Sequence, residues 1–312
     1  MSQKVRKRLA LVWSVFVCTL IVVGCGADTV WGNVSSEASS AHASADSGPT
    51  APRGCQLPTS RATVRVEDVR VNILVPDQKY IGDLLVLPAW NESGEQWCHQ
   101  TRLCGMALER GFRLILPDMG KTVYAHAIYP ETREDWRENH TIQWVKERLI
   151  PDMRNNYCLL KEDGQNFVLG ASSGARGAIL LLEELPDLFV AGAALSGDYN
   201  PAEMKGDNLY RGHLGSYEQF PDRWSVAENV VDGCAGIKSS VYLGHGKADD
   251  MISYTQTLHL YDQLKAKNPN LDIRLNLPAD MGGDFTYWGS EVASVFDFFE
   301  SMQASGPEGA MQ

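Results

Sequence analysis

The sequence predicts an α/β fold in which a mostly parallel sheet is covered by helices on both faces. Short apolar runs alternate with helical segments from about residue 57 to about residue 303, as in parallel sheets that are buried on both faces. One apolar run passes through a glycine-rich turn directly into a helix. The composition, 44% hydrophobic and 21% charged over 312 residues, is that of an ordinary globular protein.

The expected strands are of two kinds. Residues 64–75 alternate apolar and polar side chains, as half-buried strands do. Among the later strands, Leu84–Leu87 is a short apolar run and Phe112–Leu116 is mostly apolar, which fits strands covered on both faces. The later strands are Leu84–Leu87, Phe112–Leu116, Asn166–Leu169, Ala191–Leu195, Ser239–Leu243 and Leu271–Leu277.

Helical segments lie between and after these strands. The first ends at Gly111, a residue typical of helix C-caps. The expected helices are Trp97–Arg110, Asp135–Tyr157, Gly174–Leu185, Tyr254–Lys267 and Val292–Met302. The longest irregular stretch, residues 197–226, follows the carboxyl end of a strand, which is the edge where such sheets bind ligands.

The N-terminal residues have the pattern of a bacterial lipoprotein signal. Basic residues 4–8 precede the apolar segment Leu9–Val23, which is short for a membrane span, and Val-Val-Gly-Cys follows at 22–25. Residues 1–24 are therefore predicted to be a signal peptide, and Cys25 the lipidated N-terminus that holds the protein on a membrane in the bacterial cell envelope. A plain secretory signal or an uncleaved anchor is the alternative.

The remaining chain divides by composition. Residues 25–56 are rich in Ser, Ala, Gly and Asp and are predicted to be a flexible tether. A single domain over residues 57–303 and a C-terminal tail at 304–312 follow. Seven cysteines are present, of which Cys18 is lost with the signal and Cys25 is acylated, so the odd number that remains leaves at least one thiol unpaired.

Charge and motifs exclude several classes of partner. The net charge of −11 argues against nucleic acid, whose phosphates require a basic surface. The sequence contains no metal-ligand spacing such as H-E-x-x-H, and neither G-x-G-x-x-G nor a P-loop. We therefore expect neither a metal nor a cofactor.

The strongest local motif is Gly170-Ala171-Ser172-Ser173-Gly174. It satisfies G-x-S-x-G, follows an expected strand and opens an expected helix, which is the context of a nucleophile elbow. Ser172 is then the candidate nucleophile, and the backbone N–H of Ser173 a candidate donor to an oxyanion. A plain glycine-rich turn is the alternative.

A candidate acid lies further along the chain. Asp249 and Asp250 follow the strand Ser239–Leu243, in the region where a hydrolase keeps the carboxylate that orients its histidine. Asp249 is the first choice. Asp250 is the second, because it fits better as the cap of the helix that begins near residue 253.

Together these motifs resemble the putative-esterase family of α/β-hydrolases, which includes S-formylglutathione hydrolase (esterase D) and the mycolyltransferases. The resemblance runs from about residue 70 to 302 and implies the α/β-hydrolase fold, an acyl-enzyme on serine, and ester or thioester hydrolysis or acyl transfer. Its blocks, in order, are Ile115–Asp118, Glu147–Pro151, Gly170–Ala178, Leu185–Phe189, Leu195–Gly197, Gly246–Asp249 and Gly282–Trp288.

The sequence departs from this family at the catalytic histidine. Aligning Asp284, Tyr287 and Trp288 with the family segment G-H-D-x-x-Y-W places Gly283 at the histidine position. Histidine takes the serine proton and returns it to the leaving group, and losing a triad histidine costs on the order of 10⁶ in turnover. A glycine side chain performs neither step.

The oxyanion loop departs as well. The family has His-Gly after its first buried core strand, whereas this chain has Pro88-Ala89-Trp90. The N–H of Trp90 remains a candidate second oxyanion donor, while Pro88 has no N–H.

Three histidines in loops are candidates for a replacement base. His213, in the long stretch 197–226, and His126, in a loop on the reacting edge, are the first choices because mobile loops reach over a pocket. His245, next to the acid loop, is a weaker choice because active relatives also carry a histidine there. For each, a packing or loop role is the alternative.

Three functions remain open from the sequence. The first is an anchored serine esterase or acyl-transfer enzyme acting on a small-molecule ester or thioester. The second is a pseudo-esterase that binds an envelope ligand without turnover, and the third is a structural protein with a collapsed pocket.

Overall fold

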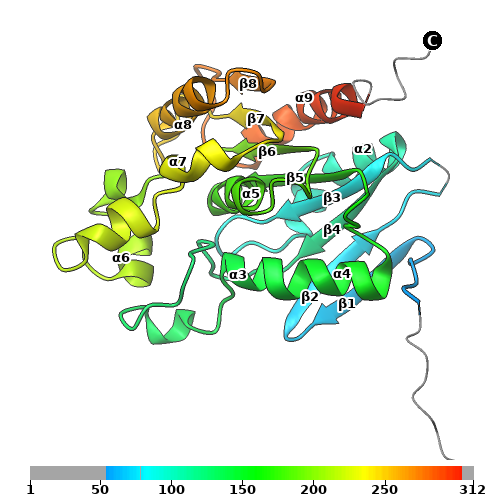
Figure 1. Ribbon diagram of the computed structural model, residues 1–312, viewed down its shortest axis with the longest axis horizontal. Helices are drawn as coiled ribbons and strands as arrows, with labels where there is room; N and C mark the ends of the chain where they lie inside the picture. Colours follow the sequence, from blue (N-terminus) through cyan, green and yellow to red (C-terminus); the bar gives the residue numbers. More distant parts are fainter. Residues whose placement is uncertain (1–53, 78, 304–312) are drawn as a thin grey trace, which may run out of the picture. The chain divides into compact units, whose positions relative to one another are not determined.

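The computed structural model describes residues 54–77 and 79–303, and these residues form an eight-stranded sheet with helices on both faces (Figure 1). The strand order is β1-β2-β4-β3-β5-β6-β7-β8. Pairs β1–β2 and β2–β4 are antiparallel, and the others are parallel. The strands are β1 (Arg61–Val66), β2 (Val69–Leu74), β3 (Gly82–Leu87), β4 (Phe112–Pro117), β5 (Asn166–Ala171), β6 (Ala191–Leu195), β7 (Ser240–Gly244) and β8 (Ile273–Asn276).

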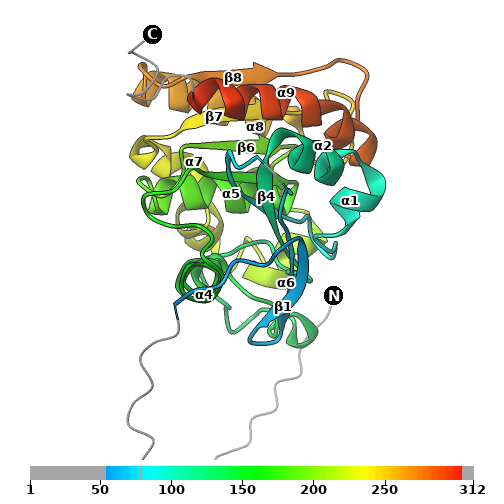
Figure 2. The same ribbon diagram turned by 90° about the vertical axis from the view of Figure 1, so that its right-hand side faces the viewer.

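Two sets of helices cover the sheet, and Figures 1 and 2 show them on opposite faces. One face carries α3 (Ile142–Trp144), α4 (Ile150–Tyr157), α5 (Ser173–Glu184), α7 (Val230–Gly233) and α8 (Tyr254–Lys267). The other carries α1 (Gln96–Gln100), α2 (Leu103–Arg110) and α9 (Phe285–Gln303). This is the predicted α/β-hydrolase fold.

Strand periodicity divides the core into two layers. In β3, Leu85 and Leu87 face the layer that contains α5, while Leu84 and Val86 face the layer that contains α9. All four side chains are fully buried. A strand with apolar side chains on both faces needs cover on both sides, which explains the continuous apolar run in the sequence.

Three predicted segments differ from the observed ones. Residues 64–75, predicted to be half-buried strand, belong to the hairpin of β1 and β2, which begins earlier, at Arg61. The segment 135–157 begins with a short 3-10 turn and a loop, and becomes helical only from Ile142, with a π-helical stretch at Val145–Leu149 between α3 and α4. The stretch 197–226 contains the helix α6 (Asn208–Leu214), whose N-cap Asp207 accepts hydrogen bonds from two backbone N–H groups.

The cysteines of the described residues form two disulfides. Cys55 pairs with Cys158 across 103 residues, and Cys98 pairs with Cys104 across six. Cys234 is free and buried, in line with the odd number expected. The first disulfide joins the segment before β1 to the end of α4.

Several predicted features lie outside the described residues: the signal peptide 1–24, the lipidated Cys25, almost all of the tether 25–56, and the tail 304–312. In residues 54–77 and 79–303, no helix has the length and apolar character that a membrane crossing requires.

The long disulfide is expected to stabilise the domain more than the short one. Closing a loop of about 100 residues removes unfolded-chain entropy worth about 4.7 kcal/mol, against roughly 2 kcal/mol for a loop of six. We therefore expect Cys55→Ala/Cys158→Ala to lower the free energy of unfolding more than Cys98→Ala/Cys104→Ala does, as measured by guanidinium denaturation. Equal losses for the two pairs would contradict this entropic explanation.

Candidate active site

Ser172 occupies a sharp turn between β5 and α5. Its φ of 52° and ψ of −125° lie in a region that serine seldom adopts. The Ser172 N–H donates to the carbonyl of Leu195 on β6 at 2.9 Å. A Cβ atom on Gly174 would lie 2.2 Å from the carbonyl oxygen of Leu87, so only glycine allows α5 to approach β3 this closely. The strand–turn–helix context predicted for the G-x-S-x-G motif is therefore present.

A cavity of about 350 Å³ opens above this turn. Ser172 lines it together with residues from the ends of β3, β6 and β7 and from the start of α9. The apolar lining consists of Ala89, Trp90, Met204, Leu209, Met251, Ile252, Phe285 and Trp288, and the polar lining of Glu92, Ser196, Asp198, Asp207, Asp249 and Asp284. A mostly apolar cavity with a few convergent polar groups is the usual form of a small-molecule site.

Asp249 is held rigidly in this cavity. Its Oδ1 accepts hydrogen bonds from the N–H groups of Met251 (2.9 Å) and Ile252 (3.0 Å), and its Oδ2 lies 3.2 Å from Nε2 of His245. His245 is itself fully buried and hydrogen-bonded to Thr257 at 2.7 Å. Burial raises the pKa of Asp249, but the hydrogen bonds from His245 and the two N–H groups outweigh burial and bring the pKa below its ordinary value.

Asp250, the second choice for the acid, is exposed and does not line this cavity. Helix α8 is capped by Ser253, whose hydroxyl accepts from the N–H of Thr255, rather than by Asp250 as the sequence predicted. The backbone between Asp249 and Ser253 forms an extra turn, so Asp250 lies too early in the chain to reach the first N–H groups of the helix.

Gly283 lies directly against the acid. A Cβ atom on Gly283 would fall 1.9 Å from Oδ2 of Asp249. Gly283 also lines the cavity, immediately before Asp284, whose carboxylate accepts from the N–H groups of Thr286 and Tyr287 at the start of α9. The histidine position of the resembling family is thus beside the acid, but the carboxylate of Asp249 fills the space in which a side chain would begin.

Two N–H groups are available for an oxyanion. Ser173 is the first residue of α5, and Trp90 lies in the turn after β3. Within residues 54–77 and 79–303, neither N–H donates to another protein group. Trp90 lines the cavity, and Ser173 directly follows Ser172 at the start of α5.

His126 is not placed to act as a base. Its ring nitrogens lie 3.1 Å from Glu184 and 3.3 Å from Glu228, and it does not line the cavity. Hydrogen bonds to Glu184 and then to Glu228 raise the pKa of His126 to about 9, so the imidazole is already protonated at neutral pH. The prediction of a replacement base at His126 is not supported by this geometry.

His213 also lies outside the cavity. Its ring packs on Trp136 with centroids 4.9 Å apart, and Trp136 in turn contacts Trp90, a cavity residue, at 5.6 Å. Burial lowers the pKa of His213 to about 4. Two aromatic rings therefore separate this imidazole from the cavity, and among the described residues no histidine lines it.

Two further residues of the site, Ser196 and Asp198, were not predicted from the sequence. Ser196, with a φ of 53°, is buried and accepts a hydrogen bond from the indole of Trp288 at 3.1 Å. Asp198 is 2% exposed, and its Oδ1 has no hydrogen-bond partner in the described chain. The sequence feature that could have predicted them is their position directly after the strand Ala191–Leu195.

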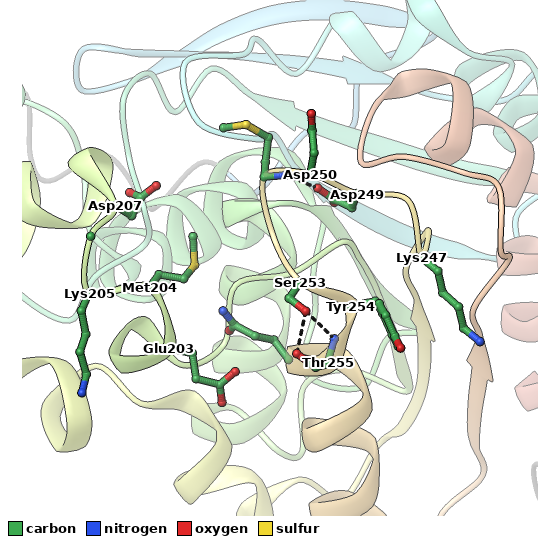
Figure 3. A pocket seen from close by; sticks show the side chains of 13 residues that line it. Glu203, Met204, Lys205, Asp207, Lys247, Asp249, Asp250, Ser253, Tyr254 and Thr255 are labelled. Carbon is green, nitrogen blue, oxygen red and sulfur yellow. Dashed lines mark hydrogen bonds between the residues drawn. The ribbon is translucent and has the colours of Figure 1, made fainter.

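A second cavity, of about 630 Å³, adjoins the first and is drawn in Figure 3. The two cavities share Met204, Asp207, Asp249 and Met251. The second is more polar and is lined by the segment 203–207 on one side and by the start of α8 on the other. Asp249 thus stands at the border between an apolar and a polar space.

The fold and the site together identify the class of protein. A serine at a strained strand–helix turn, two free N–H groups and an acid beyond β7 are the arrangement of serine hydrolases with the α/β-hydrolase fold. A family model for the prolyl oligopeptidase family matches residues 117–304, and the chain belongs to this family.

Solved structures share the fold. The fluorophosphonate-binding serine hydrolase F of Staphylococcus aureus is 16% identical, with a TM-score of 0.60 over 77% of this chain and 98% of that one. An S-formylglutathione hydrolase of Agrobacterium tumefaciens is 13% identical, with a TM-score of 0.60 over 78% and 94%. These likenesses confirm the predicted fold and the resemblance to α/β-hydrolase esterases.

A sequence relative gives a partial match. Feruloyl esterase B of Talaromyces stipitatus is 33% identical over 100 residues, which are 28% of this chain and 27% of that protein. The chain therefore matches about a quarter of the length of this relative.

The contact between Gly283 and Asp249 predicts that alanine destabilises the fold more at position 283 than at the neighbouring Gly282. Gly283→Ala forces the Asp249 carboxylate away from its three hydrogen-bond donors, and we expect a loss of about 1–3 kcal/mol in the free energy of unfolding. Gly282→Ala is the matched control, because a Cβ atom there meets nothing within 4 Å. Thermal melts of both variants test this, and an unchanged melting temperature for Gly283→Ala would contradict the observed packing.

Proposed function

We propose that this chain is an exported, lipid-anchored serine esterase, and that Ser172 is the nucleophile that attacks a carboxylic ester. The observation that carries the proposal is the Ser172 turn, which is held in a strained backbone conformation at the base of a mostly apolar cavity. Such strain costs on the order of 1–3 kcal/mol and persists where the surrounding structure enforces it, typically at functional sites.

The two donors beside Ser172 support acyl chemistry. An ester carbonyl in the cavity develops negative charge on its oxygen as the serine attacks, and the N–H groups of Ser173 and Trp90 stabilise that charge. The N-terminal end of α5, where Ser173 lies, adds the positive end of the helix dipole. The family membership supports a serine hydrolase as well.

The cavity walls indicate the substrate class. Trp90, Phe285 and Trp288 give the first cavity an aromatic lining that fits an apolar or aromatic acyl group. The adjoining polar cavity of Figure 3 carries Glu203, Lys247 and other charged side chains that fit a polar alcohol group, such as a sugar. The partial match to a feruloyl esterase agrees with an ester of an aromatic acid and a polar alcohol.

The same site accommodates thioester hydrolysis or acyl transfer to another alcohol, because both begin with the same acyl-enzyme. If water attacks the acyl-enzyme the result is hydrolysis, and if another alcohol attacks it the result is acyl transfer. We infer hydrolysis because the second cavity, which shares Asp249 and Asp207 with the first, is polar and favours water as the entering nucleophile.

Export places the domain in the bacterial cell envelope, with lipidated Cys25 at a membrane surface and residues 25–56 as the tether. The two disulfides support this location, since disulfides persist in oxidising compartments. The basic segment, apolar segment and Val-Val-Gly-Cys sequence support lipidation.

A second candidate function is that of a pseudo-esterase, which binds an envelope ligand in the cavity without turnover. Its specific support is the contact between Gly283 and Asp249, which leaves no room for the usual histidine. The open cavity argues against the third possibility, a purely structural protein with a collapsed pocket.

Labelling with a fluorophosphonate tests the proposed function. The mature chain is incubated with the probe beside the Ser172→Ala variant, and intact mass and peptide mapping locate the adduct. We expect one adduct per chain at Ser172, because the probe reports an activated serine and binds irreversibly. Hydrolysis of methyl ferulate should be lost in the same variant.

Absence of labelling in protein whose circular dichroism and thermal melt show that it is folded would favour the pseudo-esterase. Binding of ferulate or methyl ferulate to the unreactive protein, measured by calorimetry, would then identify the cavity as a ligand site.

The lipid anchor gives a separate prediction. In a bacterial host that processes lipoproteins, the chain should partition into the membrane fraction with an acylated N-terminal Cys25, because two or more acyl chains hold a protein stably on a membrane. Cys25→Ala should remain unprocessed and unacylated. Mass spectrometry of the N-terminal peptide distinguishes lipidation from simple secretion, which would leave Cys25 unmodified.

A further inference from the structure

The cavity contains a second buried carboxylate, Asp198, which comes from the strand between the candidate nucleophile and the candidate acid. We propose that Asp198 is the general base that takes the proton of Ser172, in place of the absent histidine. This inference rests on the proposed esterase function and deepens it.

The sheet register brings the segments that contain Ser172 and Asp198 to adjacent strand ends. Ala171, the last residue of β5, pairs with Leu195, the last residue of β6, and the Ser172 N–H donates to the Leu195 carbonyl. Asp198 follows Leu195 by three residues and lines the same cavity as Ser172. Residues that follow two adjacent strands, Ser172 after β5 and Asp198 after β6, therefore line one cavity.

The hydrogen-bonding state of Asp198 differs from that of Asp249. Asp249 is tied by His245 and by two backbone N–H groups, so its lone pairs are already engaged. Asp198 is 2% exposed, and its Oδ1 has no partner. A buried carboxylate oxygen without a partner is costly, and natural proteins keep one mainly where it has a function.

The groups around Asp198 set its basicity. They are Arg176 on α5, Tyr210 on α6, Asp207 at the N-cap of α6 and, across the cavity, Asp249. Burial raises the pKa of Asp198 to about 6, although the Arg176 guanidinium and the Tyr210 hydroxyl act in the opposite direction. A base of this strength is largely ionised at neutral pH and is far more basic than an ordinary aspartate.

Arg176 supplies a positive charge near Asp198. This guanidinium is fully buried, donates to Glu228 at 2.6 Å, and leaves its Nε and Nη1 unpartnered. It lies one helical turn after Ser172, and its N–H donates to the Ser172 carbonyl. The positive charge behind the elbow stabilises the carboxylate of Asp198 without taking up its Oδ1.

The proposed reaction conserves atoms, protons and electron pairs at each step. Asp198 removes the hydroxyl proton of Ser172 as Oγ bonds to the ester carbon, and the carbonyl π electrons move to the oxygen held by the Ser173 and Trp90 N–H groups. The C–O bond to the alcohol then breaks, and Asp198 gives its proton to the departing alkoxide. Water repeats the sequence on the acyl-enzyme, so ester and water become acid and alcohol.

The test measures the rate of fluorophosphonate labelling of Ser172 in the mature chain extracted in detergent. Asp198→Asn should slow labelling by roughly 10²–10⁴-fold, the usual contribution of a general base. The wild-type rate should rise with pH through about 6, the pKa of Asp198, and the variant should lose this rise. Formate added to Asp198→Ala should restore part of the rate, because a small carboxylate fills the space.

Glu183→Gln is the matched control. Its carboxylate is also poorly solvated, with an unpartnered Oε2 and a pKa that burial raises to about 7, but it lies outside the cavity. This variant should label at the wild-type rate. Removing the unpaired charge should leave the melting temperature of Asp198→Asn equal to or above that of the wild type, so a failure to fold is separable from a loss of chemistry.

The outcomes separate the inference from the proposed function. If wild-type Ser172 labels and Asp198→Asn labels equally fast, Asp198 is not the base and the esterase proposal stands. If only Asp249→Asn is slow, Asp249 is the base and the inference fails. If the wild type does not label at all, the esterase proposal and the inference that rests on it both fail.

Discussion

Helix α5 approaches strand β3 so closely that the position of Gly174 has no room for a side chain. The carbonyl of Leu87 lies where a Cβ atom would be, and this contact sets the distance between the helix and the sheet. Ser172, two residues earlier, must then turn through a left-handed φ to connect β5 to α5. The strain at Ser172 is therefore a consequence of the packing of the central helix on the central strands, and the buried layers on both faces of the sheet maintain it.

The carboxyl ends of the parallel strands explain why the site is rich in carboxylates. The ends of β5, β6 and β7 lie side by side, so Ser172, Asp198 and Asp249 enter the cavity from three neighbouring strands. Gly283, in the loop before α9, lies so close to Asp249 that a Cβ atom on it would fall 1.9 Å from Oδ2. His245, which is fully buried and does not line the cavity, lies 3.2 Å from Oδ2 of Asp249.

Much of this arrangement was predictable from the sequence. The strands β3, β5 and β6 are continuous apolar runs because they are covered on both faces, and the glycines of G-x-S-x-G predict the turn at Ser172. The replacement of histidine by Gly283 is also visible in the alignment of a short motif. These features depend on local composition and order along the chain, which a single sequence carries.

Other features depend on packing between distant segments. Asp198 lies in a stretch with loop composition, and its burial results from α5 and α6, which come together only in the fold. The proximity of Gly283 to Asp249 depends on the orientation of one side chain, and the pairing of Cys55 with Cys158 joins residues 103 positions apart. His126 and His213 were plausible bases because loops are variable in position, but an ion-pair network and a tryptophan ring hold them elsewhere.

The buried charged side chains near the Ser172 turn are better explained by a role in catalysis than by a contribution to stability. Arg176 and Glu228 are both almost fully buried, and replacing such a pair by apolar residues is often neutral or stabilising. Asp198 adds a second carboxylate to the same guanidinium, and the rise in its pKa means that its ionised form is disfavoured by folding. Because the folded-state pKa lies above the unfolded value, this group destabilises the domain as pH rises through about 6. A buried charge that weakens the fold near neutral pH, next to a strained serine, is better explained by proton transfer than by structural stability.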